Sequence, residues 1–489
     1  MSLARNPCAV VLALMLCVVA PLISGCSVRR TPTLERIFAE ARTSTDKRPI
    51  ILIPGILNSA LVNSKTGEVV WPSAFRSSND ELGLPITADP LTSSDDLVAT
   101  KIIDSARFIP LFPKINIFRE LLEALHKYGG YREGDWDDPG PNGDRDTFYV
   151  FAYDWRRDNA RTAIEFVRRV ESLKRKLQRP DLRFNIVAVS MGGLVARYAA
   201  MYGDVDLPLE NMLPRPNWAG AAHINKMFMF GVPNEGSAEA FATLLNGYSI
   251  TEGLNRRVRL LNKLSREDAL AGLSVFQLLP HSDAVHFLDG DLKPLPIDLY
   301  DPAVWKLYGW SAVHDPDYRR RFINGSAQGG KSSPKHRSPT ELDTHLAAAL
   351  LRAKLFHQAL DAPFEGQPPV TIFAFGGDCE ETLHAPVILR DERNNRWITL
   401  TSPRELRGSD GRRISRREVM HAMYAPGDGR VTRCSMLAES HARLNKRLFY
   451  NTVLPIAYAY FACDTHGNLH NNKALQDNAL TVLLNEATR

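Results

Sequence analysis

Five short apolar runs along the chain have the length and composition of buried β-strands. They cover residues 49–53, 148–153, 184–189, 227–232 and 370–375. Continuous apolar strands are typical of parallel sheets that helices cover on both faces. Residues 160–177 have helical periodicity with a basic face, and residues 194–201 begin a helix almost directly after a strand. The alternation predicts an α/β fold with a doubly wound, mostly parallel sheet.

Two long intervals, residues 57–145 and 235–369, interrupt this alternation. Each is too long for a loop, and insertions at the carboxyl ends of strands cover the site in such folds. We therefore expect a lid-containing insertion and a cap. Residues 324–340 are rich in Gly, Ser, Lys and Pro and are expected to be disordered. An Arg-rich insertion, residues 390–417, is expected to form two solvated hairpins, with attraction to anionic lipid headgroups as the functional alternative.

The N-terminus has the pattern of an export signal. Arg5 precedes an apolar run over residues 8–23 that is short for a membrane span. The run leads into Ser24-Gly25-Cys26, which resembles the bacterial lipoprotein cleavage box, where the cysteine thiol accepts a lipid. We expect residues 1–25 to be a signal peptide, 26–48 a membrane tether and stalk, and 49–489 the α/β domain. A plain secretory signal with a coincidental cysteine is the alternative.

Residue Ser27, rather than an aspartate, follows the cysteine. By resemblance to sorting rules in Gram-negative bacteria, this favours an outer-membrane lipoprotein that faces the periplasm or the surface. The formal net charge is only +5, and basic residues alternate with acidic ones over most of the chain. This balance gives no support to nucleic-acid binding.

Residues 184–189 run into Ser190-Met191-Gly192-Gly193 and then a helix, which is the strand, tight turn and helix of a nucleophile elbow. The turn requires small residues two before and two after the serine, and Ala188 and Gly192 stand there. Glycine is usual at both. The N–H of Met191 would supply one oxyanion donor. The turn after residues 49–53 would supply the second, from Ile56 or its neighbour Leu57.

An activated serine needs a histidine base and a carboxylate, in the chain order Ser, Asp, His for this fold. Asp428, between two glycines, is the candidate acid. His466 is the preferred base, since Gly467 lets its loop turn sharply before the last helix, which we expect over residues 474–484. His470 is the competing base, and His441 is a third candidate that we expect to be structural.

The cysteines that remain after signal removal and lipidation are Cys379, Cys434 and Cys463, so at most one disulfide forms. We expect Cys379 to pair with Cys434, because both flank the candidate acid loop. Neither a Cys-x-x-Cys pair nor a histidine pair at ligand spacing accompanies these cysteines, so no metal or other cofactor is expected.

Several motifs occur in the order and spacing of one family. They are residues 49–57, Tyr153-Asp154-Trp155-Arg156, residues 187–193, residues 231–237 and residues 427–431. In these motifs the chain resembles the lecithin:cholesterol acyltransferase family, whose relatives include lysosomal phospholipases and phospholipid:diacylglycerol acyltransferases. The resemblance covers most of the chain from Pro49 and is weakest over residues 235–369. It implies an α/β-hydrolase fold with a set of site residues: Ser190, Asp428 and His466 for catalysis, and Ile56 with Met191 at the oxyanion hole.

The resemblance also implies a lid in which Trp71 faces the acyl chain. The Tyr153–Arg156 motif is expected to brace the sheet rather than touch substrate. The sequence departs from the family in its lid disulfide, which is missing, and at two positions. Val189 stands before the serine in place of the usual histidine, and Arg430 follows the acid in place of threonine.

These features predict a serine-dependent lipid acyl-ester hydrolase or O-acyltransferase that forms an acyl-enzyme at Ser190. Its expected partner is a phospholipid-like substrate at a membrane surface, and the apolar run Phe108-Ile109-Pro110-Leu111-Phe112 in the lid interval fits that substrate. Two alternatives remain open. One is a catalytically inactive lipoprotein that binds lipid or protein, and the other is a serine hydrolase of non-lipid esters.

Overall fold

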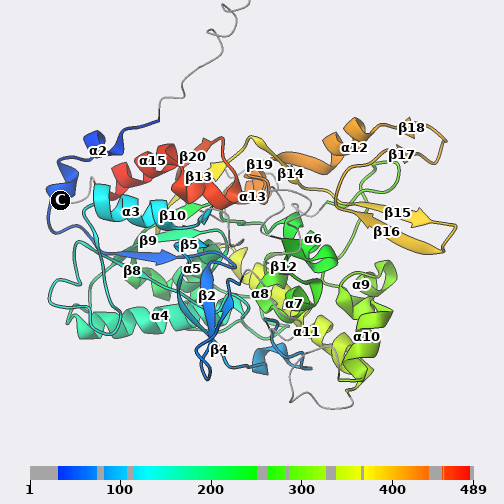
Figure 1. Ribbon diagram of the computed structural model, residues 1–489, viewed down its shortest axis with the longest axis horizontal. Helices are drawn as coiled ribbons and strands as arrows, with labels where there is room; N and C mark the ends of the chain where they lie inside the picture. Colours follow the sequence, from blue (N-terminus) through cyan, green and yellow to red (C-terminus); the bar gives the residue numbers. More distant parts are fainter. Residues whose placement is uncertain are drawn as a thin grey trace, which may run out of the picture.

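The computed structural model describes residues 31–73, 82–106, 115–249, 263–281, 286–325, 337–364, 368–439, 454 and 456–484. Its centre is one seven-stranded sheet in the order β20-β13-β10-β9-β1-β8-β7 (Figure 1). The strands are β1 (Ile50–Ile53), β7 (Arg132–Glu133), β8 (Thr147–Val150), β9 (Phe184–Val189), β10 (Ile224–Phe230), β13 (Thr371–Gly377) and β20 (Ile456–Ala462). All neighbours pair in parallel. The predicted α/β-hydrolase fold is confirmed.

Both faces of the sheet are buried, which explains the continuous apolar strands. Along β1, Ile51 and Ile53 point into one core, which α4 (Asn159–Lys176) and α5 (Met191–Tyr202) complete. Ile50 and Leu52 point into the opposite core. That core is completed by α3 (Arg119–Glu123) and α15 (Lys473–Leu484).

The two expected insertions have different architectures. The first contains an antiparallel sheet of β2 (Ser59–Asn63), β3 (Val69–Trp71) and β4 (Leu97–Ile102) and a short ladder of β5 (Ser105–Ala106) with β6 (Ile115–Asn116). The second is helical, with α6 (Ala238–Asn246), α7 (Arg266–Ala271), α8 (Leu273–Phe276), α9 (Pro302–Tyr308), α10 (Pro316–Ile323) and α11 (Pro339–Leu360). Buried residues of α11 belong to the same core as the sheet. The cap is therefore packed onto the fold rather than separate from it.

The expected disorder over residues 324–340 falls mostly on residues outside the described ranges. Residues 337–340 are described, and Pro339 is the first residue of α11. Its start is capped by Ser338, whose hydroxyl accepts from the N–H of Thr340 at 3.3 Å. The helix thus begins inside the stretch that composition alone assigns to disorder.

Residues 387–423 form a projecting unit at one end of the molecule, which we call the arginine lobe (Figure 1). It contains the hairpin β15 (Val387–Asp391) with β16 (Arg396–Leu400), the hairpin β17 (Leu406–Arg407) with β18 (Arg413–Ile414), and α12 (Arg416–Met423). The two hairpins expected from the sequence are present. Inside the lobe, a small apolar cluster includes Val387, Ile414 and Val419.

The expected Cys379–Cys434 disulfide is wrong, because Cys379 is bonded to Cys463. Gly377 at the end of β13 pairs with Ala462 at the end of β20, so the two cysteines follow neighbouring strand ends. Cys434 lies outside this bond, in α13 (Arg433–Leu437). Within the described ranges, no helix is long and apolar enough to cross a membrane. The expected signal peptide, residues 1–25, and Cys26 lie outside those ranges.

Candidate active site

Ser190 occupies the tight turn between β9 and α5. Its backbone has φ 52° and ψ −128°, a conformation that is strained for a residue with a side chain. The N–H of Ser190 donates to the carbonyl of Phe230 at 2.8 Å, which ties the turn to β10. A Cβ at Gly192 would lie 2.5 Å from the carbonyl oxygen of Ile53, so only glycine fits there. This close approach is the packing that a nucleophile elbow requires.

Three predicted side chains form one hydrogen-bonded chain. His466 Nε2 lies 2.9 Å from the Ser190 hydroxyl oxygen, and His466 Nδ1 lies 2.7 Å from Asp428 Oδ2. An ionised carboxylate only accepts, so the imidazole carries its proton on Nδ1 and leaves Nε2 as the acceptor for the serine hydroxyl. The backbone N–H of His466 also donates to the carbonyl of Asp428 at 2.8 Å. The arrangement is that of a nucleophile, a base and an orienting acid.

Asp428 is held as a fully buried carboxylate by its own loop. Its Oδ1 accepts from the N–H groups of Arg430 at 3.0 Å and Val431 at 2.7 Å. These bonds leave Oδ2 for His466. The next N–H, of Gly429, donates to the Thr382 hydroxyl on β14 (Glu380–Leu383) at 2.8 Å. Gly427, on the other side of the acid, pairs with Glu380 of β14, so the loop is anchored to this strand on both sides of Asp428.

Gly231 is a site residue whose purpose the sequence did not reveal. It follows β10 with φ 58°, and a Cβ there would lie 3.1 Å from His466 Nδ1 and 3.2 Å from Asp428 Oδ2. A side chain at 231 would press on the hydrogen bond between base and acid. A glycine inside a predicted buried strand, here residues 227–232, is the signal that could have indicated this close approach.

His470, the competing base, is directed away from the serine. Its ring is fully buried against Phe118, with ring centroids 4.3 Å apart. Nε2 lies 2.5 Å from the carbonyl oxygen of Ile117. Burial lowers the pKa of His470 to about 4, so the ring stays neutral. The structure therefore brings His466, not His470, to Ser190, and His441 lies outside the described residues.

The turn after β1 lies directly against the serine. A Cβ at Gly55 would be 2.9 Å from Ser190 Cβ, so the next residue, Ile56, is carried to the edge of the site. Met191 is the first residue of α5, where N–H groups have no intrahelical acceptor. Both proposed donors thus belong to backbone that borders Ser190, and their oxyanion role stays a prediction.

The Tyr153–Arg156 motif braces this turn and the first insertion. The Tyr153 hydroxyl donates to the Pro54 carbonyl at 2.9 Å, and the Trp155 indole N–H donates to the Ser59 carbonyl at 3.2 Å. The guanidinium of Arg156 is almost fully buried and forms ion pairs with the carboxylate of Asp95 and with that of Asp154. These contacts agree with the bracing role expected for the motif.

Two further predicted residues have clear partners. Trp71 is fully buried, and its indole N–H donates to the Leu57 carbonyl at 2.8 Å. Its expected contact with an acyl chain stays a prediction. The guanidinium of Arg430 forms an ion pair with Glu239 at 3.1 Å and lies 4.4 Å from the centroid of the Tyr248 ring. Arg430 therefore points away from Asp428 toward α6.

No protein-family model and no curated protein matches the chain. Among solved structures, the chain is similar to the crystal structure of the Tle4–Tli4 complex, with a TM-score of 0.52 and 12% identity over 90% of this chain and 98% of that chain. Weaker likenesses are to the mature Bacillus licheniformis lipase BlEst2 (TM-score 0.30, 11% identity, 90% and 92% covered) and to EstA from Clostridium botulinum (TM-score 0.31, 12% identity, 93% and 91% covered). At such identities the first likeness supports the fold alone.

Proposed function

We propose that the chain is a serine-dependent hydrolase or O-acyltransferase of lipid acyl esters that works through an acyl-enzyme at Ser190. The observation that carries the proposal is the hydrogen-bonded relay from Ser190 through His466 to Asp428. Ser190 and Asp428 are buried, and only a fifth of the His466 side chain is exposed. Water therefore competes little with these bonds, which favours an activated serine.

In the first step the hydroxyl oxygen of Ser190 attacks the ester carbonyl carbon, and its proton moves to His466 Nε2. Asp428 stabilises the imidazolium and keeps its own charge. The N–H groups of Met191 and Ile56 receive the negative oxygen, and loss of one such donor typically costs about 10²–10³ in kcat. His466 then returns the proton to the departing alkoxide, which leaves the acyl group on Ser190.

The second step repeats this route with a new nucleophile. Water or an alcohol attacks the acyl carbonyl carbon, and His466 takes its proton. When the adduct collapses, the proton returns to the Ser190 oxygen. Water yields a free fatty acid, whereas an alcohol yields a new ester, so the acceptor decides between hydrolase and acyltransferase.

A lipid donor is supported by three features of the sequence. The motifs resemble those of the lecithin:cholesterol acyltransferase family. Residues 108–112, outside the described ranges, form an apolar run in the insertion that begins beside Ile56. The expected lipid on Cys26 would hold the enzyme at a membrane, where such a substrate is concentrated.

The test is product analysis on mixed phospholipid vesicles, with and without a sterol or a long-chain alcohol, beside the Ser190→Ala variant. Free fatty acid alone identifies a hydrolase, and a new ester that depends on the added alcohol identifies a transferase. Either product must disappear in Ser190→Ala. Product that persists in this variant, or wild-type protein that yields neither product, contradicts the proposal.

We also propose that the mature chain begins at Cys26 and is anchored through a lipid on that residue to a bacterial envelope membrane, with the outer membrane favoured by Ser27. The support comes from the signal-like residues 1–25. Mass spectrometry of the N-terminal peptide should find a diacylglyceryl group on Cys26. An unmodified Cys26, or cleavage at another residue, would contradict the anchor.

A further inference from the structure

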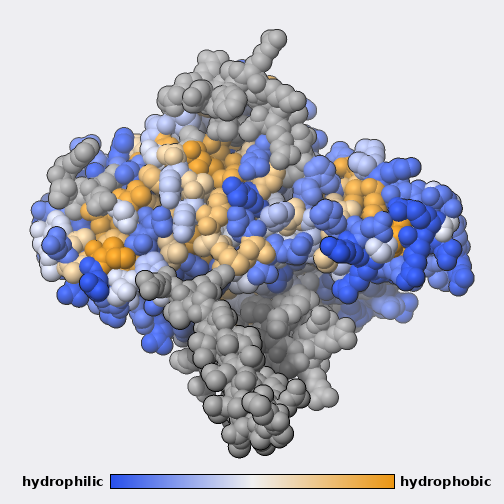
Figure 2. Space-filling model, turned by 90° about the horizontal axis from the view of Figure 1, so that it is seen from above, coloured by the Kyte–Doolittle hydropathy of each residue, from blue (hydrophilic) through white to orange (hydrophobic). Residues whose placement is uncertain are grey.

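The arginine lobe carries most of the net charge of the protein. Residues 387–423 contain nine arginines and five carboxylates, an excess of four positive charges, whereas the whole chain has a formal net charge of +5. Seen from above, this end of the molecule is mostly hydrophilic around a small hydrophobic area (Figure 2). The lobe is therefore a localised basic surface on an otherwise nearly balanced protein.

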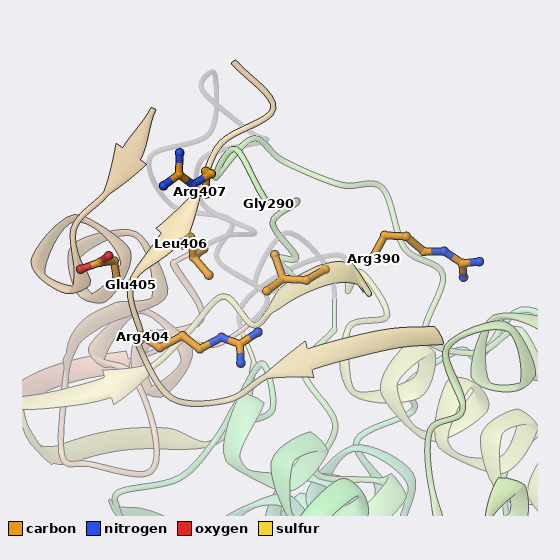
Figure 3. A pocket seen from close by; sticks show the side chains of 7 residues that line it. Gly290, Arg390, Arg404, Glu405, Leu406 and Arg407 are labelled. Atoms are coloured by element: carbon orange, nitrogen blue, oxygen red, sulfur yellow. The ribbon is translucent and has the colours of Figure 1, made fainter. Parts of the chain in front are cut away.

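An open cavity of about 440 Å³ lies in this lobe, between its two hairpins and a loop from the cap. Its volume falls within the range of roughly 300–1,000 Å³ that is usual for small-molecule sites. Figure 3 shows the side chain of Arg404 extending into this region below the strand that carries Leu406 and Arg407. The cavity is lined by Gly290, Leu389, Arg390, Arg404, Glu405, Leu406 and Arg407.

Two of the three arginines at the cavity have charges that no carboxylate neutralises among the described residues. The ion pairs of the lobe are formed by other arginines. The carboxylate of Glu405, which lines the cavity, is paired with Arg413. Among the described residues, the hydrogen bond of the Arg407 guanidinium goes to the Gly411 carbonyl, at 3.3 Å, and Arg404 is exposed. The guanidinium groups of Arg404 and Arg407 are therefore available to an anion.

The walls of the cavity are fixed before any ligand arrives. The N–H and the hydroxyl of Ser409 both lie 2.7 Å from the carboxylate of Asp291, which joins the second hairpin to the cap loop. The N–H of Ile388 donates to the Leu288 carbonyl at 2.8 Å and joins the first hairpin to the same loop. Such a frame reduces the entropy lost on binding.

We propose that this cavity binds the phosphate group of an anionic lipid headgroup and so docks the arginine lobe on an anionic membrane. Planar guanidinium groups match phosphate oxygens. A lipid is favoured over free phosphate because the excess of four positive charges on the lobe adds long-range attraction to a charged membrane surface, beyond the direct contacts made in the cavity. Leu389 and Leu406 add apolar lining next to the guanidinium groups, as the glycerol end of a headgroup requires.

The lobe is joined to the catalytic relay by a short strand. The chain leaves α12 through β19 (Tyr424–Gly427), and the next residue is Asp428. β19 pairs with β14, so this connection is part of a ladder rather than a loose linker. A docked lobe would therefore keep the acid loop close to the membrane, yet its cavity shares no residue with the relay. The docking proposal does not depend on the proposed function.

The test is vesicle sedimentation of the full chain carrying Cys26→Ser, so that no lipid at residue 26 contributes. The measured quantity is a ratio of two partition coefficients, one for vesicles with about one quarter phosphatidylglycerol in phosphatidylcholine and one for phosphatidylcholine alone. Replacement of Arg404 or Arg407 by alanine should lower this ratio about fivefold. Gly290→Leu should lower the ratio without a change of charge, because a Cβ at 290 already lies 3.2 Å from Leu389 Cδ2. Ser190→Ala should leave it unchanged.

The matched control is Arg393→Ala, which removes an exposed arginine of the same lobe from outside the cavity lining. Its ratio should fall by less than twofold. Equal losses in Arg393→Ala and Arg404→Ala, or full retention in Gly290→Leu, would overturn the pocket assignment. Binding of inorganic phosphate with no preference for the anionic vesicles would overturn the lipid assignment. Circular dichroism spectra of Arg404→Ala and Gly290→Leu should match that of the unchanged chain, which shows that the variants are folded.

Discussion

The hydroxyl of Tyr153 donates a hydrogen bond to the carbonyl oxygen of Pro54 at 2.9 Å, with both residues buried. Pro54 begins the turn that carries Ile56 past Ser190. Burial raises the pKa of Tyr153, so the hydroxyl keeps the proton that it donates. A side chain that follows β8 by three residues thereby fixes the backbone that would hold the oxyanion.

Replacing Tyr153 with phenylalanine should lower kcat about tenfold with little change in KM, because the lost bond orients a group that acts in the transition state. The matched control is Tyr149→Phe, which removes the buried bond from Tyr149 on β8 to the Gly143 carbonyl at 2.8 Å. Steady-state kinetics on a soluble ester compare the two. Equal losses of kcat in both variants would mean that the effect is general destabilisation.

Asp428→Asn should lower kcat about 10³–10⁴-fold while the fold is retained, because the amide N–H would then favour the imidazole tautomer with its proton on Nε2. That tautomer cannot accept the serine proton. Asp464→Asn changes another carboxylate near the base, one that accepts from Asn468 at 2.9 Å rather than from the imidazole. Its kcat should fall less than tenfold, and a loss as large as that of Asp428→Asn would remove the special role of residue 428.

Removing the disulfide should destabilise the protein strongly. Cys379 and Cys463 are 84 residues apart, and closure of a loop of that length contributes about 4.5 kcal/mol to the free energy of unfolding. Chemical denaturation of Cys463→Ser should show this loss, and reducing agent should add nothing further to it. Cys434→Ser is the control and should change stability by less than about 1 kcal/mol. The reverse order of the two effects would contradict the observed pairing.

Stability should fall as the pH is lowered, owing to two fully buried histidines. Burial lowers the pKa of His357 to about 3 and that of His470 to about 4, below the ordinary value of 6.5. Between the folded pKa of each histidine and 6.5, the unfolded protein binds more protons than the folded protein. The free energy of unfolding therefore rises with pH across this window and reaches its full value only above about pH 6.5.

Between about pH 7 and about pH 5, each of these histidines should cost about 2 kcal/mol. Denaturation curves at both pH values measure the loss. In His470→Gln, the difference between the two curves should shrink by about the contribution of one histidine. An unchanged difference would show that His470 takes up its proton equally in the folded and the unfolded protein.

The sequence predicts those parts of the fold that leave a local pattern of residues along the chain. Residues 50–53 are apolar at every position and residues 184–189 at every position but Asn185, because both faces of the sheet are covered. The elbow at Ser190 follows from small residues at fixed spacing. β20 was missed. It is an edge strand with exposed and half-exposed side chains, so it lacks the buried run by which the other strands were recognised.

The prediction of a Cys379–Cys434 disulfide is wrong because the sequence does not reveal β20. Cys463 directly follows β20, and only the pairing of β20 with β13 brings it to Cys379. Without that strand, nearness in the chain to the acid loop favoured Cys434. The choice of His466 over His470 similarly depends on a long-range contact, since His470 is held by the carbonyl of Ile117. A local sequence pattern does not reveal contacts between segments that are distant in the chain.

The central claim is that Ser190 is a nucleophile activated by His466 and Asp428. It is tested most directly by incubating the protein with a fluorophosphonate probe and locating the adduct by mass spectrometry. The account predicts one adduct, on Ser190, that forms in the unchanged chain, is slowed strongly in Asp428→Asn and is absent in Ser190→Ala. A folded protein that remains unlabelled, or an adduct that persists on another residue in Ser190→Ala, would contradict it.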